Sequence, residues 1–296
     1  WSQYNKKLIK RGEILLDFTT LKNWKKELKK MNKNKRGKPY KYPNTLITLI
    51  ALIRILYHLP YRETQGFIKA LTKHIKELRT LGTPDYTTIY RRTRKLNINI
   101  GENIIKSKGG ITITVDSTGV KVHNGGDWIR KVWGVRKGYL KIHFGVDVRT
   151  KQVVSMAVTS EKVHDGRVLK RLVRGAFNVV RVRRLLGDGG YDSRKNFSFL
   201  ERVGVKPVIK VRRNASSRSK GCASRRQVVL ELRRLGFRGW SRVHRYGRRW
   251  AVEGVFSWFK RVFGEFVCAR KFVNMVKEVM LKVYLYNLFM RDLRTA

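Results

Sequence analysis

Apolar residues follow two different periods along this chain. Up to about residue 100 they recur every three to four positions, which predicts helices. Beyond residue 110 they alternate or form short runs between helical segments, which predicts strands. The helices expected in the first part cover 21–31, 45–58, 61–75 and 85–96. The pattern therefore divides the chain into a helical region at 1–100, with a basic linker at 32–42, and a second domain at 108–296.

The second part predicts an α/β domain. Its expected strands are 111–115, 139–148, 152–159, 181–186 and 206–211. Its expected helices are 165–177, 193–203, 225–235, 248–263 and 275–288, and 117–138 is expected to be a long connection. Three consecutive strands followed by alternating helices and strands favour a mixed five-stranded sheet with helices on both faces.

The last helix expected before residue 100 is strongly basic. It carries Arg91, Arg92 and Arg94 and has few apolar positions. Three short helices ending in a basic one are typical of a helix-turn-helix-like region, whose last helix enters the major groove of DNA. We therefore expect these three arginines to contact DNA. The alternative is a small helical bundle whose Arg-rich helix binds nothing, and the linker at 32–42 has a similar alternative as a solvated charge run.

Charge is the outlying property of the composition. Lys and Arg number 68 against 20 Asp and Glu, a formal net charge of +48. Such a charge destabilises a compact protein unless a polyanion neutralises it, so DNA is the expected partner. A membrane is not expected, because the longest apolar run, 46–57, contains Arg54 and is too short to span a bilayer. The two cysteines form neither a disulfide framework nor a zinc motif, which predicts a protein of the reducing cytoplasm. With DNA as its partner, it is expected to be associated with the nucleoid.

Polar residues near the C-terminus share one helical stripe. Tyr246, Arg249, Glu253 and Lys260 recur at steps of three, four and seven, which on a helix place them on one side. The neighbouring stripe is apolar: Val252, Val255, Phe256, Phe259 and Phe263. One side can thus pack on a core while the other points a carboxylate among cations into a cleft. The alternative is a surface helix with ordinary ion pairs.

Two further carboxylates stand where strands are expected to end, Asp116 and Asp188. Carboxylates at the ends of neighbouring strands can share a metal, and Glu253 could complete the set. Oxygen ligands without His or Cys favour Mg²⁺ or Mn²⁺ over zinc, and two such ions can activate and stabilise the oxygens of a phosphodiester. The alternatives are a strand-end turn at Asp116 and an Asp-Gly turn at Asp188.

Other acids and histidines are expected to be structural. Asp147 is interpreted as a hairpin residue, and Asp165 and Asp192 as helix caps. His164 is interpreted as a loop histidine, with a supporting place beside the site as the alternative. No metal role is expected for His143.

These motifs resemble the DDE transposases of bacterial and archaeal insertion sequences, close to the groups numbered four and five. The resemblance rests on three segments: Ile113-Thr-Val-Asp116-Ser-Thr-Gly119, Leu186-Gly-Asp188-Gly-Gly-Tyr191-Asp-Ser193, and Tyr246-x2-Arg249-x3-Glu253-x6-Lys260. The last matches the signature of those groups at every spaced position. The resemblance covers about residues 40 to 290.

The resemblance implies a ribonuclease-H-like core in which Asp116, Asp188 and Glu253 hold two Mg²⁺ or Mn²⁺ ions. Tyr246, Arg249 and Lys260 would contact DNA near the scissile phosphate. Asp188 follows Asp116 by 72 positions and Glu253 follows Asp188 by 65, so we expect no large insertion before Glu253.

The implied activity is metal-dependent hydrolysis at the ends of the element, followed by transfer of the freed 3′-hydroxyl into target DNA by a homodimer. Three alternatives remain open: a nuclease that cuts without joining, an inactive or domesticated DNA-binding protein, and a basic nucleoid or ribosomal protein.

Overall fold

The computed structural model describes residues 1–13, 21–123, 125–134, 138–218 and 220–295. The chain begins with six helices: α1 (Ser2–Glu13), α2 (Trp24–Asn32), α3 (Asn44–Leu56), α4 (Tyr61–His74), α5 (Lys76–Leu81) and α6 (Tyr86–Lys95). The helices predicted from apolar spacing are present, with α1 and α5 in addition. Among the described residues, no single helix has the length and apolarity to cross a membrane; α3 and α4 meet those criteria only as a pair bent by 116°.

The second part contains a mixed sheet, as the sequence predicts. Its strands are β1 (Ile111–Val122), β2 (Tyr139–Asp147), β3 (Val153–Ser160), β4 (Val182–Gly187), β5 (Lys206–Ile209) and β6 (Phe266–Val267). The order is β3-β2-β1-β4-β5, with β6 paired to the end of β1. β1 to β3 are antiparallel, whereas β4, β5 and β6 run parallel to β1. The predicted ribonuclease-H-like fold is therefore present, with one short strand more than the five expected.

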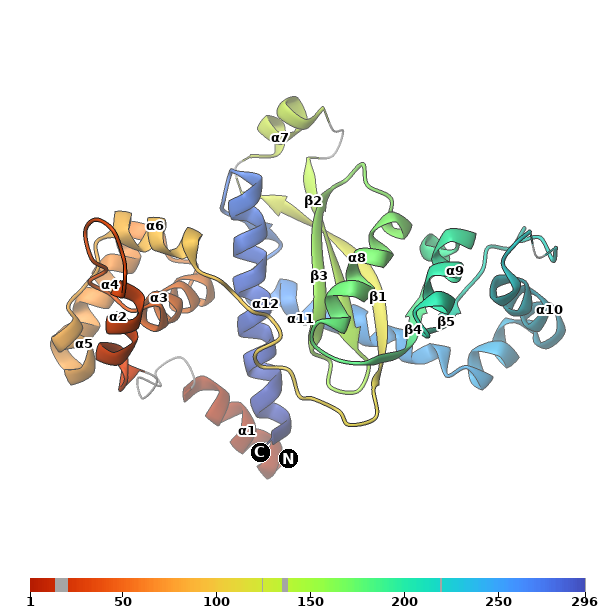
Figure 1. Ribbon diagram of the computed structural model, residues 1–296, viewed down its shortest axis with the longest axis horizontal. Helices are drawn as coiled ribbons and strands as arrows, with labels where there is room; N and C mark the ends of the chain where they lie inside the picture. The colour runs from red at the N-terminus through yellow and green to blue at the C-terminus, as the bar shows by residue number, and fades with distance from the viewer. Residues whose placement is uncertain (14–20, 124, 135–137, 219, 296) are drawn as a thin grey trace.

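Helices cover both faces of this sheet. One face packs against α8 (Asp165–Phe177) and α9 (Arg194–Arg202), and the kinked α10 (Ala223–Val243) packs in turn on α9. The other packs against α11 (Trp250–Phe263) and α12 (Phe272–Thr295). Figure 1 shows α12 running between the N-terminal helices and the sheet. Apolar residues of α3 join the core formed by α11, α12 and the sheet, so the helical region packs directly on the second domain.

The first strand is longer than its alternation predicts. β1 continues through 117–122 because these residues pair with β2 over most of their length and with β6 at the end. The expected long connection is thus shortened, and α7 (Gly126–Trp133) occupies part of it. Positions 124 and 135–137, within the expected connection, lie outside the described residues. As a consequence Asp116 lies within β1 and not at its end.

Candidate active site

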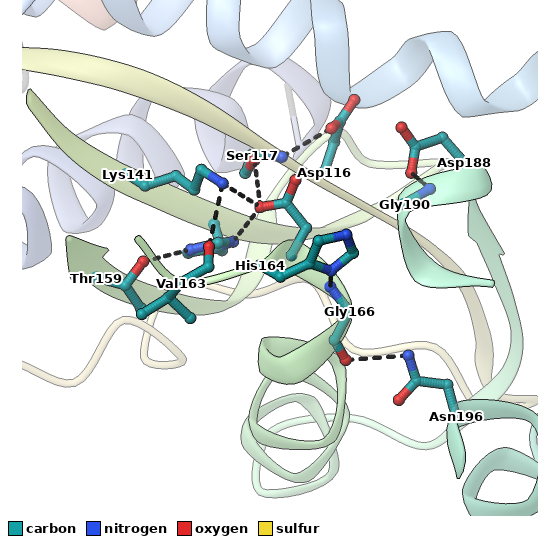
Figure 2. Close-up of polar contacts among 12 residues, drawn as sticks. Asp116, Ser117, Lys141, Thr159, Val163, His164, Gly166, Asp188, Gly190 and Asn196 are labelled. Carbon is teal, nitrogen blue, oxygen red and sulfur yellow. Dashed lines mark hydrogen bonds and ion pairs between the residues drawn. The ribbon is translucent and has the colours of Figure 1, made fainter. Parts of the chain in front are cut away.

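Strand register brings the first two carboxylates side by side. β1 and β4 are parallel neighbours in which Thr114 pairs with Leu186, an offset of 72 positions. Asp116 and Asp188 have the same offset, so each lies two residues beyond a register pair. Figure 2 shows the two carboxyl groups next to each other, with that of Asp188 accepting the Gly190 N–H at 2.9 Å.

The third carboxylate comes from α11, which packs on the same face of β1. Phe144 is the cross-strand partner of Asp116, so both side chains point to one face of the sheet. Phe256 of α11 stacks on Phe144 with ring centroids 5.1 Å apart. Glu253 lies one turn before Phe256 on that helix. The apolar stripe predicted for this segment therefore positions the acidic residue beside Asp116.

A short 3₁₀ helix, η4 (Tyr246–Arg249), contacts β1, which carries Asp116, and β4, which ends directly before Asp188. The Tyr246 hydroxyl donates to the Gly187 carbonyl at 3.1 Å, and the Arg249 carbonyl accepts from the Thr114 hydroxyl at 3.4 Å. Tyr246 thus differs from its predicted place: it precedes α11 and is buried. Arg245, in the left-handed region at φ 50°, begins η4.

Arg249 joins the acids. Its Nη1 donates to Asp116 Oδ2 at 3.0 Å, and its Nη2 donates to Glu253 Oε1. Burial lowers the pKa of Arg249, but Tyr246 and these two carboxylates outweigh that effect and raise it. The guanidinium is therefore a firmly charged bridge between two of the three acids.

Burial and like charge act together on Asp116. Burial raises the pKa of its carboxyl group, and the charges of Asp188 and Glu253 raise it further, against the Ser117 N–H and Arg249, which lower it. The three acids therefore interact electrostatically, although they come from segments far apart in the sequence. Burial likewise raises the pKa of Tyr246 to about 12.

The carboxylate set suits a hard divalent ion in chemistry but does not hold one in this arrangement. Among the described residues, no group of three or more His, Cys, Asp or Glu side chains is placed to bind a metal. Arg249 instead occupies oxygen atoms of Asp116 and Glu253 that would serve as ligands. The predicted two-ion site therefore does not fit the present conformation.

The other predicted DNA contacts lie in different environments. Lys260 is on α11, with its Nζ 3.9 Å from Glu265 Oε1. On α6, Arg91 is exposed, whereas the Arg94 Nε donates to Asn274 Oδ1 at 3.1 Å. Arg92 differs from the expectation, because it is buried.

Arg92 serves inside the helical region. Its guanidinium donates to the Tyr42 carbonyl at 3.0 Å and to Asn44 Oδ1 at 2.7 Å, and it stacks over the Tyr40 ring. These contacts fix the chain between the linker and α3, so Arg92 has no exposed guanidinium to offer a groove.

A polar network around Asp165 lies on the opposite face of β1. The sequence predicts only a helix cap at Asp165. The Asp165 carboxylate accepts from the Ser117 hydroxyl at 2.9 Å and pairs with Lys141 Nζ at 3.0 Å. His143 Nδ1 lies 3.6 Å away, and His143 Nε2 is 2.9 Å from the Thr159 hydroxyl. Burial lowers the pKa of His143 to about 4. The sequence does contain a signal for this network, because Lys141 and His143 are two positions apart on an expected strand and so share one face of it.

This network approaches the acids through Tyr191. Its hydroxyl is buried and has no hydrogen-bond partner among the described residues. Burial raises the pKa of Tyr191, and the charges of Asp165, Asp116 and Asp188 raise it further. Tyr191 therefore lies close to Asp165 as well as to Asp116 and Asp188. Close packing of the loop after β4 also explains Gly166, where a Cβ would lie 2.9 Å from the Gly190 carbonyl oxygen.

Comparison with known proteins gives the family. Two family models described as transposase DDE domain match, one over residues 107–288 and the other over 9–125. Among solved structures, the chain is similar to a piggyBac transposase in a synaptic complex with hairpin DNA, with 11% identity over 96% of this chain and 75% of that one. The TM-score of that likeness is 0.41. Because the first model alone spans more than half of the chain, this protein belongs to the transposase DDE domain family.

Proposed function

We propose that this chain is the transposase of an insertion sequence, which binds the ends of its element, cleaves a strand there and transfers it into target DNA. The observation that carries the proposal is the convergence of Asp116, Asp188 and Glu253 around Arg249. The spacing of Tyr246, Arg249, Glu253 and Lys260 supports membership of the insertion-sequence groups four and five. A homodimer acting beside the nucleoid in the cytoplasm remains our expectation.

The chemistry proposed is two successive displacements at phosphorus. In the first, a water oxygen bonds to the phosphorus at the element's end, and the bond to the 3′ oxygen breaks to give a 3′-hydroxyl. In the second, that hydroxyl bonds to a phosphorus of the target and displaces another 3′ oxygen. Asp116, Asp188 and Glu253 would hold the divalent ions that neutralise the charge of the reacting phosphate, and no nucleotide cofactor is required.

Arg249 would change partners when DNA enters. A guanidinium binds phosphate oxygens in the same two-pronged geometry that it uses for carboxylates. A phosphate beside α11 would therefore compete with Asp116 and Glu253 for it. Members of this family use divalent metals, and we propose that Mg²⁺ or Mn²⁺ binds the carboxylates only after Arg249 has left them. Lys260 would hold the neighbouring phosphate.

DNA binding would extend to the helical region. The net charge of +48 supports a long phosphate contact. Arg91 and Arg94 remain the proposed contacts on α6, whereas Arg92 and Tyr246 would act by positioning, because both are buried.

Replacement of Glu253 by Gln tests the assignment. The substrate is a duplex that carries the inverted repeats flanking the gene, and the control is Glu201→Gln, an exposed acid on α9. We expect Glu253→Gln to lose strand cleavage and to keep end binding, and the control to keep both. Cleavage by Glu253→Gln at the unsubstituted rate would remove Glu253 from the site.

A pre-cut end with a free 3′-hydroxyl distinguishes a transposase from a nuclease that only cuts. The transposase joins that end to a supercoiled plasmid, and the nuclease does not. A chain that binds the ends and does neither would be the inactive DNA-binding protein.

A further inference from the structure

A cavity of about 310 Å³ lies where the helical region meets α12. Its walls come from α3, α4, α6, the segment 268–271 after β6, and the first turns of α12. None of Asp116, Asp188 and Glu253 lines it. A ligand in this cavity would touch both parts of the chain at once.

The lining is strongly cationic. Its charged residues are Arg54, Arg94, Arg270, Lys271 and Lys277, together with the acid Glu278. Glu278 is already engaged, because its carboxylate accepts the N–H groups of Cys268 and Ala269 at 3.0–3.1 Å and lies 3.3 Å from Lys282 Nζ. The excess positive charge of the cavity is therefore not neutralised by its own acid, which favours an anionic ligand.

Two buried polar atoms on the wall have no hydrogen-bond partner among the residues that the structure describes. The Thr93 side chain is 5% exposed, and its hydroxyl makes no hydrogen bond within the described chain. The Arg54 Nε is buried and likewise makes none within that part of the structure. The Arg54 guanidinium stacks over the Tyr61 ring at 4.1 Å, which holds it in place. Buried polar groups are normally satisfied, so two potential donors on one wall indicate that an acceptor comes from outside.

We propose that this cavity binds a phosphate group. A phosphate offers several strong acceptors to Thr93 and Arg54, and its charge is complementary to the lining. The volume suits one phosphate with its attached sugar, so one backbone phosphate of a duplex would enter while the bases stay outside. The inference rests on the proposed function in that the source is the DNA backbone; a free phosphate has the same chemistry and is the other source.

Phosphate binding here would connect the helical region to the catalytic domain. Arg94 of α6 already reaches Asn274 of α12 at 3.1 Å, and Lys277 donates to the Leu96 carbonyl at 2.5 Å. A phosphate between Arg54 and the segment 268–271 would add a charged link across the same junction. Contact of DNA with the helical region would then fix the position of α12.

The test uses the full chain with Thr93→Val, which removes only the hydroxyl. Its matched control is Ser155→Ala on β3, away from the cavity, which removes another buried hydroxyl that makes no hydrogen bond within the described ranges. Neither change removes a hydrogen bond, so both variants should melt at or above the temperature of the unsubstituted chain. Arg54→Met is a second variant, which keeps the stem of the side chain and removes the donor.

Binding is measured with two probes. The first is a short DNA duplex, followed by fluorescence anisotropy, for which we expect Thr93→Val to weaken binding roughly tenfold and Ser155→Ala to leave it unchanged. The second is inorganic phosphate, followed as a rise in melting temperature against chloride at equal ionic strength. We expect that rise to be smaller in Thr93→Val and in Arg54→Met than in the control.

The probes separate the outcomes. A loss with the duplex assigns the cavity to the DNA backbone, and a loss with inorganic phosphate alone assigns it to a free phosphate. Equal binding of both probes by all variants would overturn the proposal. Because neither measurement involves cleavage, the result is independent of the Glu253→Gln experiment.

Discussion

The hydroxyl of Tyr246 donates a hydrogen bond to the carbonyl of Gly187 at 3.1 Å, directly before Asp188. This contact fastens the start of η4 to the end of β4, while Thr114 holds its other end to β1. The relationship gives Tyr246 a positioning role, since its hydroxyl is used inside the protein and not toward a ligand.

Replacement of Tyr246 by Phe should therefore lower stability and cleavage together. The loss leaves a carbonyl without its partner, so we expect about 1 kcal/mol less free energy of unfolding and a slower cleavage rate, with DNA affinity unchanged. Denaturant unfolding and anisotropy measure these quantities. Tyr286→Phe is the control, because its hydroxyl donates to the Lys151 carbonyl away from the acids; it should lose similar stability and keep cleavage. A fall in DNA affinity with stability intact would instead make Tyr246 a direct contact.

Much of the fold follows from local patterns, because periodicity reports which side of an element is buried. The order of strands and helices and the apolar stripe of α11 could be predicted in this way. The length of β1 could not, because 117–122 is held by pairing with β2 and β6 and not by its own alternation. The 3₁₀ helix at Tyr246 could not be predicted either, because it is held by contacts with β1 and β4 that lie far away in the sequence.

The candidate site shows the same division. Expected strand ends point to Asp116 and Asp188, and helical spacing points to Glu253. The structure places them close enough for Asp188 and Glu253 to raise the pKa of Asp116. Spacing could not show that Arg249 would bind two of them, because a guanidinium at that position can equally face solvent. Nor could it show that Asp165, at the start of α8, binds Ser117 of β1 and Lys141 of β2.

Removal of the Arg249 guanidinium should open the carboxylates to metal. Without DNA, we expect Arg249→Ala to bind Mn²⁺ roughly tenfold more tightly than the unsubstituted chain, because two charge-assisted hydrogen bonds no longer compete. Electron paramagnetic resonance of free Mn²⁺ measures the affinity. Arg261→Ala, which removes an exposed cation on α11, should change it little. Equal affinities for Mn²⁺ in Arg249→Ala and the unsubstituted chain would refute the competition.

Buried His143 should make stability depend on pH. Its pKa falls from 6.5 to about 4 on folding, chiefly through burial, with Lys141 and Arg171 lowering it and Asp165 opposing them. Between pH 6.5 and 4, His143 is therefore protonated in the unfolded chain and neutral in the folded chain. The stabilisation is full above pH 6.5 and is lost as pH falls toward 4, by up to roughly 3 kcal/mol.

Unfolding by denaturant at several pH values between 7.5 and 4 checks this, with His143→Gln for comparison. Gln does not titrate and its amide can still bond to the Thr159 hydroxyl. The difference between the two proteins isolates His143 from the carboxyl groups, which titrate in both. Parallel pH profiles would show that His143 does not carry the effect.

Two adjacent arginines of α6 should respond in opposite ways. Arg91 is exposed, in a groove beside Tyr86 and Tyr90, whereas Arg92 is buried on Tyr42 and Asn44. Arg91→Ala should weaken DNA binding at every sequence and reduce the salt slope by about one, with the melting temperature unchanged.

Arg92→Met should instead cost about 1–3 kcal/mol of stability by leaving two acceptors unpaired. It should keep the salt slope of the folded protein. Anisotropy over a KCl series and thermal unfolding measure both, with the exposed Arg202→Ala as the control. The reverse pattern would place Arg92, and not Arg91, on DNA, and would require α6 to rotate away from Tyr42 when it binds.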